Sequence, residues 1–222
     1  MIPRPQHNEQ KPKVSDQKKA GYHHGDLKEA LISAAKQLIQ DKGPEGFSMA
    51  EACRIAGVSP AAPYRHFADR DELVGAVASQ GFDSLTDRGK EERDKHPPGS
   101  VASIVALGQA YVKFAADEPA IFRLMFASHK GEDAFHDSVK QQGDRCFNIL
   151  LKAVNAFQEA KGLGTTKTLD IALPLWTIVH GTACLLIDRD FDAVAPGTDP
   201  DELVRIATEG FLAGISTKLA KV

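Results

Sequence analysis

Apolar residues recur at intervals of three and four along the chain, which is the pattern of helices with one buried face. The first stripe lies within residues 27–39 and ends at Gly43-Pro44, the second lies between Phe47 and Gly57, and the third runs from Leu73 to Leu85. Each stripe follows a residue that can cap a helix, with Glu three positions later: Asp26 and Glu29, Ser48 and Glu51, Asp69 and Glu72. These signals predict three helices within residues 25–88.

The second half of the chain shows the same periodicity and no convincing alternation at period two. It predicts helices over 101–117, over a short stretch that begins at Pro119, over 135–160, and from the cap Asp199 to about Leu219. The apolar run 171–187 contains Pro174 and His180, falls short of a membrane span and predicts a buried helix. We therefore expect an all-α protein: an N-terminal three-helix domain followed by a C-terminal helical bundle over 100–222.

The segment GVSPAAPYRHF, residues 57–67, joins the second and third predicted helices. Gly57 suits the left-handed backbone after a helix, Ser59 is a good N-cap, and Pro60 fits the first helical position. Pro63 stands at the fourth position of the predicted helix, where its missing N–H removes only one hydrogen bond, to the Ser59 carbonyl at the helix start. This pattern predicts a two-turn helix over 60–67, and with the helix before it a helix-turn-helix.

The second helix of such a pair lies in the major groove with its N-terminal end toward the bases. Small residues at its front, Pro60, Ala61 and Ala62, would allow close approach and contact with thymine methyl groups. Hydrogen-bond donors follow at Tyr64, Arg65 and His66, and Arg65 is the candidate for a bidentate contact to guanine.

Phosphate contacts are expected nearby, at the capped helix starts of Ser48 and Ser59. Arg70 stands in a first helical turn, where a cation opposes the helix dipole. A phosphate or a neighbouring carboxylate would each explain it.

Residues 22–73 resemble the DNA-binding domain of the TetR family of bacterial transcriptional regulators, and the similarity extends over about 22–85. The family's segment ending in Tyr, a basic or aromatic pair and Phe corresponds to Tyr64, Arg65, His66 and Phe67, with Arg70 at the place of a Lys. Two departures are Cys53 in place of a small Ala, and Ala61-Ala62-Pro63 in place of Gly-Thr-Leu. The resemblance implies a dimer that binds a palindromic operator in double-stranded DNA.

Residues 174–190 also resemble a C-terminal domain type of TetR regulators with a Trp-His-Gly signature, here Trp176, His180 and Gly181. Trp176 and His180 are four apart and share a helix face. They form either core packing, with the histidine bonded to a backbone carbonyl, or the wall of a pocket for a small-molecule effector. The apolar remainder of such a pocket would come from Phe122, Met125, Phe126 and Phe147.

In the resembling family the last two helices pair with their copies across a two-fold axis. Small residues spaced for close helix approach, together with one flanking aromatic, would form that homodimer interface: Ala207, Gly210, Phe211 and Gly214. Packing within one chain is the alternative explanation for the same residues.

Charge alone does not suggest DNA, because the net charge is −3. Residues 1–24 are basic and Pro-rich, which fits either a disordered tail or an arm that gains order on phosphates. Three scattered cysteines, no CxxC pair and no apolar leader fit a cytoplasmic protein without disulfides or structural zinc. We expect no cofactor and no membrane partner.

Two other classes of protein remain as alternatives. An enzyme would need a catalytic constellation that we do not find; the nearest metal-like cluster, His129 and His136 with Glu132, Asp133 and Asp137, reads as a solvated stretch. A redox sensor would use Cys146 or Cys184, both on apolar stripes. We therefore predict a ligand-responsive repressor released from its operator by a small apolar molecule, and not an enzyme. A constitutive DNA-binding protein without effector is the alternative.

Overall fold

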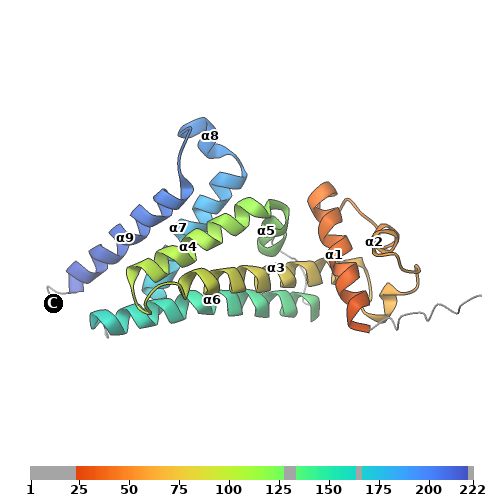
Figure 1. Ribbon diagram of the computed structural model, residues 1–222, viewed down its shortest axis with the longest axis horizontal. Helices are drawn as coiled ribbons and strands as arrows, with labels where there is room; N and C mark the ends of the chain where they lie inside the picture. Colours follow the sequence, from red (N-terminus) through yellow and green to blue (C-terminus); the bar gives the residue numbers. More distant parts are fainter. Residues whose placement is uncertain (1–23, 128–133, 164–166, 220–222) are drawn as a thin grey trace, which may run out of the picture.

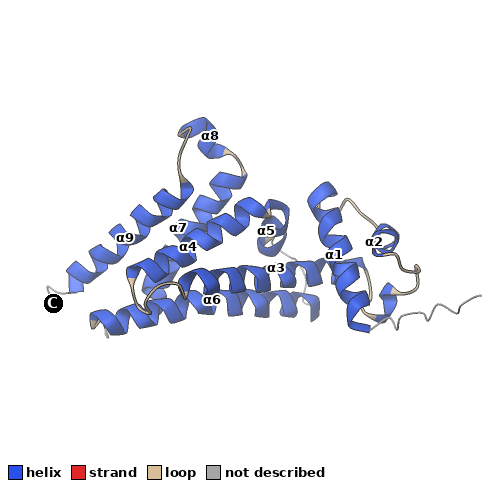
Figure 2. Cartoon of the chain, in the orientation of Figure 1, coloured by secondary structure: helices blue, strands red, loops and turns tan. Residues whose placement is uncertain are grey.

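The structure is a computed structural model that describes residues 24–127, 134–163 and 167–219. Over these ranges the chain is helical, with no strand (Figure 2). The helices are α1 (His24–Lys42), α2 (Met49–Ala56), α3 (Arg70–Arg93), α4 (Val101–Asp117), α5 (Pro119–Phe126), α6 (Ala134–Lys161), α7 (Thr168–Ile187), α8 (Asp190–Val194) and α9 (Pro200–Leu219), with a 3-10 turn at Pro63–Arg65. The prediction of an all-α protein is confirmed. Sequence periodicity missed only the short α8.

The molecule is elongated, with α1 and α2 at one end and the C-terminal end of α9 at the other (Figure 1). We call residues 24–69 the head, and α4–α9 with the second half of α3 the body. The 24-residue helix α3 starts beside the head and continues into the body alongside α6. Within the body, α4 packs on α3, α7 and α9.

Side-chain caps begin the helices where the sequence predicted them. Ser48 and Glu51 form a reciprocal capping box at α2, and the Asp69 side chain accepts from the Glu72 N–H at α3. The Asp199 carboxylate accepts from the N–H groups of Asp201 and Glu202 at α9. The first helix begins two residues before its predicted cap Asp26.

The predicted apolar stripes form the core. In the head, Leu31, Ile39 and Phe47 pack with Phe67 and Leu73, each 6% exposed or less. The body core includes the fully buried rings of Phe114, Phe122 and Phe157. A Cβ on Gly108 would lie 3.0 Å from side chains of α7 and α9, so glycine lets α4 approach both helices closely.

Helix α7 is the single helix of the described ranges that is long and apolar enough to cross a membrane, judged by length and composition alone. It packs against α4, α6 and α9 and buries Ile171, Leu175 and Val179, as predicted for the run 171–187. Its opposite face leaves Leu169, Leu173 and Leu185 more than 40% exposed. The helix therefore has one face in the core and several exposed leucines that no element of the described residues covers.

Candidate nucleic-acid interface and ligand cavity

The turn after α2 is closed by glycine, as predicted. Gly57 has φ 68° and ψ 30°, and its N–H points to the carbonyls of Arg54 and Cys53. The next N–H, of Val58, also bonds the Cys53 carbonyl at 3.0 Å, and its side chain packs on the head core. The chain therefore leaves α2 in one fixed direction.

The prediction of a two-turn α-helix over residues 60–67 is wrong. Only Pro63–Arg65 is helical, as a 3-10 turn, and the Ala62 N–H bonds the Ser59 carbonyl at 3.0 Å while the His66 N–H bonds the Pro63 carbonyl at 2.8 Å. Pro60 and Pro63 lack the N–H groups that would start an α-helical ladder, so the chain coils mainly through bonds between residues three apart, and one bond between residues four apart, from the Phe67 N–H to the Pro63 carbonyl at 2.9 Å, closes the turn. The predicted N-cap bond of Ser59 is also not among the hydrogen bonds of the described residues.

Five of the predicted contact residues in this segment lie on the surface: Ser59, Pro60, Ala61, Tyr64 and Arg65. Tyr64 is 62% exposed, an unusual position for an aromatic ring, while the neighbouring Phe67 anchors the segment in the core at 3%. Neither the Tyr64 side chain nor the Arg65 side chain has a hydrogen bond or ion pair with a described residue. Their donors are therefore available to a partner.

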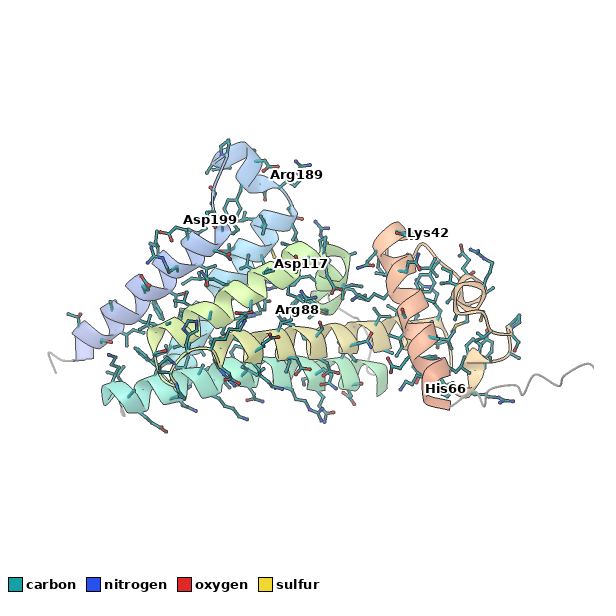
Figure 3. All side chains as sticks on the ribbon, viewed as in Figure 1. Lys42, His66, Arg88, Asp117, Arg189 and Asp199 are labelled. Carbon is teal, nitrogen blue, oxygen red and sulfur yellow. The ribbon has the colours of Figure 1, made fainter. Side chains whose placement is uncertain are left out.

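His66 and Ala62 are turned further inward and are half-buried. His66 lies at the lower end of α1 (Figure 3), and its Nε2 atom is buried without a partner among the described residues. The structure thus separates His66 from the exposed pair Tyr64 and Arg65.

At the start of α2, Ser48 is exposed but engaged. Its backbone N–H donates to Glu51 Oε2 at 2.9 Å, and Lys42 Nζ donates to Glu51 Oε1 at 2.7 Å. The bond from Lys42, with that from the Ser48 backbone, lowers the pKa of Glu51 to about 2. A phosphate at this helix start would meet the ionised carboxylate of Glu51. Because Glu51 already accepts from the Ser48 N–H, the helix start offers fewer free N–H groups than the sequence suggested.

Arg70 follows the carboxylate alternative rather than the phosphate one. Its guanidinium bonds the backbone carbonyls of Phe47 and Pro44, pairs with Asp71 at 2.7 Å and Glu45 at 3.3 Å, and lies over the Phe47 ring. These bonds tie the loop between α1 and α2 to the first turn of α3. The role that the structure supports for Arg70 is to hold the head together.

A charge cluster joins the head to the body. Glu118, at the start of α5, is 9% exposed; its Oε2 lies 2.5 Å from Lys36 Nζ of α1 and its Oε1 accepts from Arg88 of α3 at 3.1 Å. The contact between Lys36 and Glu118 is an ion pair by distance, but its angles do not meet those of a hydrogen bond, so Glu118 Oε2 has no hydrogen-bond donor among the described residues. Arg88 also pairs with Asp117 at 3.0 Å (Figure 3). Side chains of α1 and α3 thus meet at one carboxylate, which lies between α4 and α5.

The body contains an apolar cavity of about 310 Å³ between α3, α4, α5, α6, α7 and α9. Of the predicted ligand-binding residues, Phe126, Phe147 and Trp176 line it, whereas Phe122 and Met125 lie in the surrounding core. Sequence reasoning missed most of the wall, which includes Phe82, Leu85, Leu107, Tyr111, Leu150 and Thr208. Apolar side chains that come together from six helices give no local signal in the sequence.

His180 lies behind the cavity wall, stacked on Trp176 with ring centres 5.1 Å apart. Its Nδ1 is 2.8 Å from the Tyr111 hydroxyl, so the predicted bond to a backbone carbonyl is wrong. Burial lowers the pKa of His180 and raises that of Tyr111, and both groups are therefore neutral near pH 7. The sequence signal for this pair was Tyr111 itself, because a buried tyrosine needs a partner for its hydroxyl.

The outer face of α9 is apolar and open. Leu203 is 37% and Ile206 55% exposed, and a Cβ on Gly210 or Gly214 would meet nothing within 4 Å. Phe211 instead packs against the body core, and Ala207 is half-buried. Two of the four predicted interface residues therefore share an exposed face with Leu203 and Ile206.

The cysteines and histidines indicate no further chemistry. Burial raises the thiol pKa of Cys53, Cys146 and Cys184, which keeps them protonated and weakly nucleophilic. Among the described residues no three metal-ligating side chains cluster. Most of the histidine-acid stretch 129–137, like the basic arm of residues 1–23, lies outside the described ranges.

Two family models match the chain. Residues 31–77 match that of the bacterial regulatory proteins of the tetR family, and residues 104–211 match that of the tetracyclin repressor-like C-terminal domain. The second match includes Trp176, His180 and Gly181, but its description does not name a Trp-His-Gly type.

Similar proteins agree with the family models. An uncharacterized HTH-type transcriptional regulator from Haemophilus influenzae is 29% identical over 103 residues, 46% of this chain and about half (50%) of the length of that relative. A solved structure of a Rhodococcus sp. RHA1 protein of unknown function is 31% identical, with a TM-score of 0.75, over 87% of this chain and 97% of that one. A putative transcriptional regulator from Pseudomonas aeruginosa PAO1 shares the fold at 17% identity, with a TM-score of 0.70, over 86% and 90% of the two chains.

Proposed function

Because the chain belongs to the TetR family of bacterial regulatory proteins, we propose that it is a dimeric cytoplasmic repressor that binds a palindromic DNA operator and leaves it when a small apolar molecule binds the body. The proposed DNA-binding domain is 25–88 and the ligand-binding and dimerisation domain is 100–222. Helix α3 serves both, because it starts in the head and its residues Leu85 and Gly89 line the cavity.

The observation that carries the proposal is the segment 59–65. Two donors, Tyr64 and Arg65, project from a backbone that is fixed by Gly57 on one side and by the buried Phe67 on the other. Ser59, Pro60 and Ala61 add a small exposed front, so the backbone can approach a groove closely. In our proposal Arg65 reads a base, Tyr64 contacts the phosphate backbone, and Ala62 and His66 take a minor part.

Arg65→Ala and Tyr64→Ala test this assignment. Both variants should lose specific binding to a DNA fragment found by footprinting on the sequence beside the protein's own gene, and both should keep their oligomeric state. The control is Arg189→Ala, which removes an exposed arginine beside α8, away from the head (Figure 3). Operator affinity of wild-type strength in the head variants would contradict the assignment.

Salt dependence provides a second readout. The logarithm of the binding constant should fall by about 0.9 per neutralised phosphate for each unit in the logarithm of salt concentration. A response that is flat between low and physiological salt would exclude a phosphate-dominated interface.

Dimerisation is supported by the uncovered apolar faces of α7 and α9. Exposed leucines on α7 and Leu203 and Ile206 on α9 lie beside glycines with open space outside them, so a second pair of helices could pack there closely. A dimer also supplies two copies of segment 59–65. Because one short turn makes few contacts with DNA, two copies on one palindrome are needed for useful affinity.

Ile206→Glu should convert the dimer to a monomer in light scattering coupled to size-exclusion chromatography. Val194→Glu is the control, because Val194 is 84% exposed on α8 and lies outside the α7 and α9 faces. A dimer that survives Ile206→Glu would place the interface elsewhere, and a wild-type protein that is monomeric would refute dimerisation.

Effector control is supported by the cavity and by its connection to the head. Phe126 of α5 lines the cavity and packs edge-on to His180, while Glu118 at the start of α5 pairs with Lys36 of the head. A ligand that moves α5 would therefore act on α1. A coupling of about 1–3 kcal/mol is enough to change operator occupancy several-fold.

Leu107→Trp tests the effector role, because a larger side chain there fills the cavity. The variant should still bind the operator but should no longer respond to apolar compounds that release the wild-type protein. If no compound in a hydrophobic library releases the wild type, the constitutive DNA-binding alternative is correct.

A further inference from the structure

The polar side chains that line the cavity are few: Tyr111, Cys146, Trp176 and Thr208. The indole N–H of Trp176 can only donate, and the thiol of Cys146 is a weak donor and acceptor. The Tyr111 hydroxyl lies 2.8 Å from Nδ1 of His180. The hydroxyl of Tyr111 therefore has a partner inside the protein.

Thr208 differs from Tyr111 in this respect. It lies on α9, lines the cavity and is only 2% exposed, yet its hydroxyl has no hydrogen bond within the described part of the chain. Other helical hydroxyls on α7 and α9 bond the carbonyl four residues earlier: Thr177, Thr182, Ser216 and Thr217, at 2.8–3.0 Å. Thr208 does not make the corresponding bond to Val204. Among the described residues, the Thr208 oxygen is not one of the fully buried polar atoms without a partner, so it keeps accessible surface although the residue as a whole is buried. Because Thr208 lines the cavity, a molecule in the cavity can bond this hydroxyl.

The cavity also lacks charge. Its lining, as far as the described residues form it, contains no acidic, basic or histidine side chain. A carboxylate or ammonium group in this apolar space would lose its hydration and meet no counter-ion, which is far more costly than burying a neutral oxygen. The volume, about 310 Å³, lies at the small end of the range for ligand pockets.

We infer that the effector is a small uncharged molecule, largely hydrocarbon, whose single oxygen hydrogen-bonds the Thr208 hydroxyl. An alcohol, a phenol or a ketone fits this class, because a hydroxyl can donate to a carbonyl or exchange bonds with another hydroxyl. Organic anions whose charged group must enter the cavity are excluded from it. The inference rests on the proposed effector role of the cavity and adds the chemical class and the residue that selects it.

Three ring compounds of one shape, 2-naphthol, naphthalene and 2-naphthoate, test the inference by isothermal titration calorimetry at pH 7.5 on the full chain without DNA. We expect 2-naphthol to bind at least tenfold more tightly than the ionised 2-naphthoate. Thr208→Val should weaken 2-naphthol binding by roughly three- to tenfold, the value of one neutral hydrogen bond, and should leave naphthalene binding unchanged. Thr208→Ser keeps the hydroxyl and should keep the preference for 2-naphthol.

The inference is overturned if 2-naphthoate binds as tightly as 2-naphthol, if Thr208→Val leaves 2-naphthol binding unchanged, or if none of the three compounds binds. Thermal unfolding of both variants shows whether they are folded, and Thr208→Ser gives the readout if Thr208→Val is not. Operator binding is measured separately, without ligand. If the wild type does not bind DNA, the regulator proposal is refuted, whereas the binding of 2-naphthol at Thr208 is judged from calorimetry alone.

Discussion

Glu118 offers the sharpest test of how the head is attached to the body. Glu118→Gln keeps the shape of the side chain but removes the charge that Lys36 and Arg88 share. The side chain of Glu118 is 11% exposed, whereas those of Lys36 and Arg88 are 34% and 39% exposed. The perturbation therefore leaves two half-hydrated cations facing a neutral amide.

The expected cost follows from that partial burial. Removing one partner of a fully buried ion pair costs about 3–5 kcal/mol, whereas exposed pairs are worth about 0–1 kcal/mol. Because solvent reaches both cations, we expect a loss of about 1–2 kcal/mol in the free energy of unfolding. For a chain of this length that corresponds to a fall in Tm of roughly 3–6 °C.

The assay is urea unfolding followed by circular dichroism, for Glu118→Gln, Lys36→Met and the double variant. Coupling between Glu118 and Lys36 should make the double variant about 1 kcal/mol less destabilised than the sum of the single ones. Asp87→Asn removes an exposed pair on the same helix as Arg88 and should have no measurable effect. If Glu118→Gln is as silent as Asp87→Asn, or if the effects of Glu118→Gln and Lys36→Met simply add, the charge cluster does not hold the head.

Three further changes probe the local structure. Burial depresses the pKa of His180, so on acidification the unfolded chain takes up a proton at this histidine before the folded chain does. The free energy of unfolding should therefore fall as pH drops from about 6.5 toward the lower pKa of the folded protein. The loss of stability between pH 7.5 and 5.5, measured by urea unfolding, should be smaller in His180→Gln. Tyr111→Phe should cost about 1–3 kcal/mol in urea unfolding, since it strands His180 Nδ1 without its 2.8 Å partner. Gly57→Ala should cost about 1 kcal/mol because of its φ of 68°, with Gly57→Asn milder in the same thermal unfolding assay; equal stability of all three forms would contradict this.

Periodicity and caps predicted the helices because both act over a few residues. Leu31 and Leu73 are buried where the stripes placed them, and Ser48 and Asp69 cap the helices that follow them. The segment after Ser59 was mispredicted for an equally local reason. Two prolines three apart remove donors from an α-helical start, and the balance between an α-turn and a 3-10 turn is too small to read from residue types.

The candidate site was harder to predict than the fold because its walls depend on long-range packing. Thr208 lies more than sixty residues from Cys146 in the chain and yet lines the same cavity. For Arg70 the sequence left a phosphate and a neighbouring carboxylate both open, and only the fold brings its guanidinium to the carbonyls of the loop between α1 and α2 and to the carboxylates of Glu45 and Asp71. Donors and acceptors that meet only after folding leave no spacing for sequence reasoning to detect.

Because α3 is one continuous helix, a rotation of its end at the cavity displaces its end at the head. The helix runs without a break from Arg70, at the head, to Gly89, at the cavity, a length of about 28 Å at 1.5 Å per residue. Since a helix is stiff over this length, a tilt of about 5° at the Gly89 end would swing the Arg70 end through roughly 2.5 Å. In the proposed dimer this displacement would occur in both copies, and it would change the distance between the two segments 59–65.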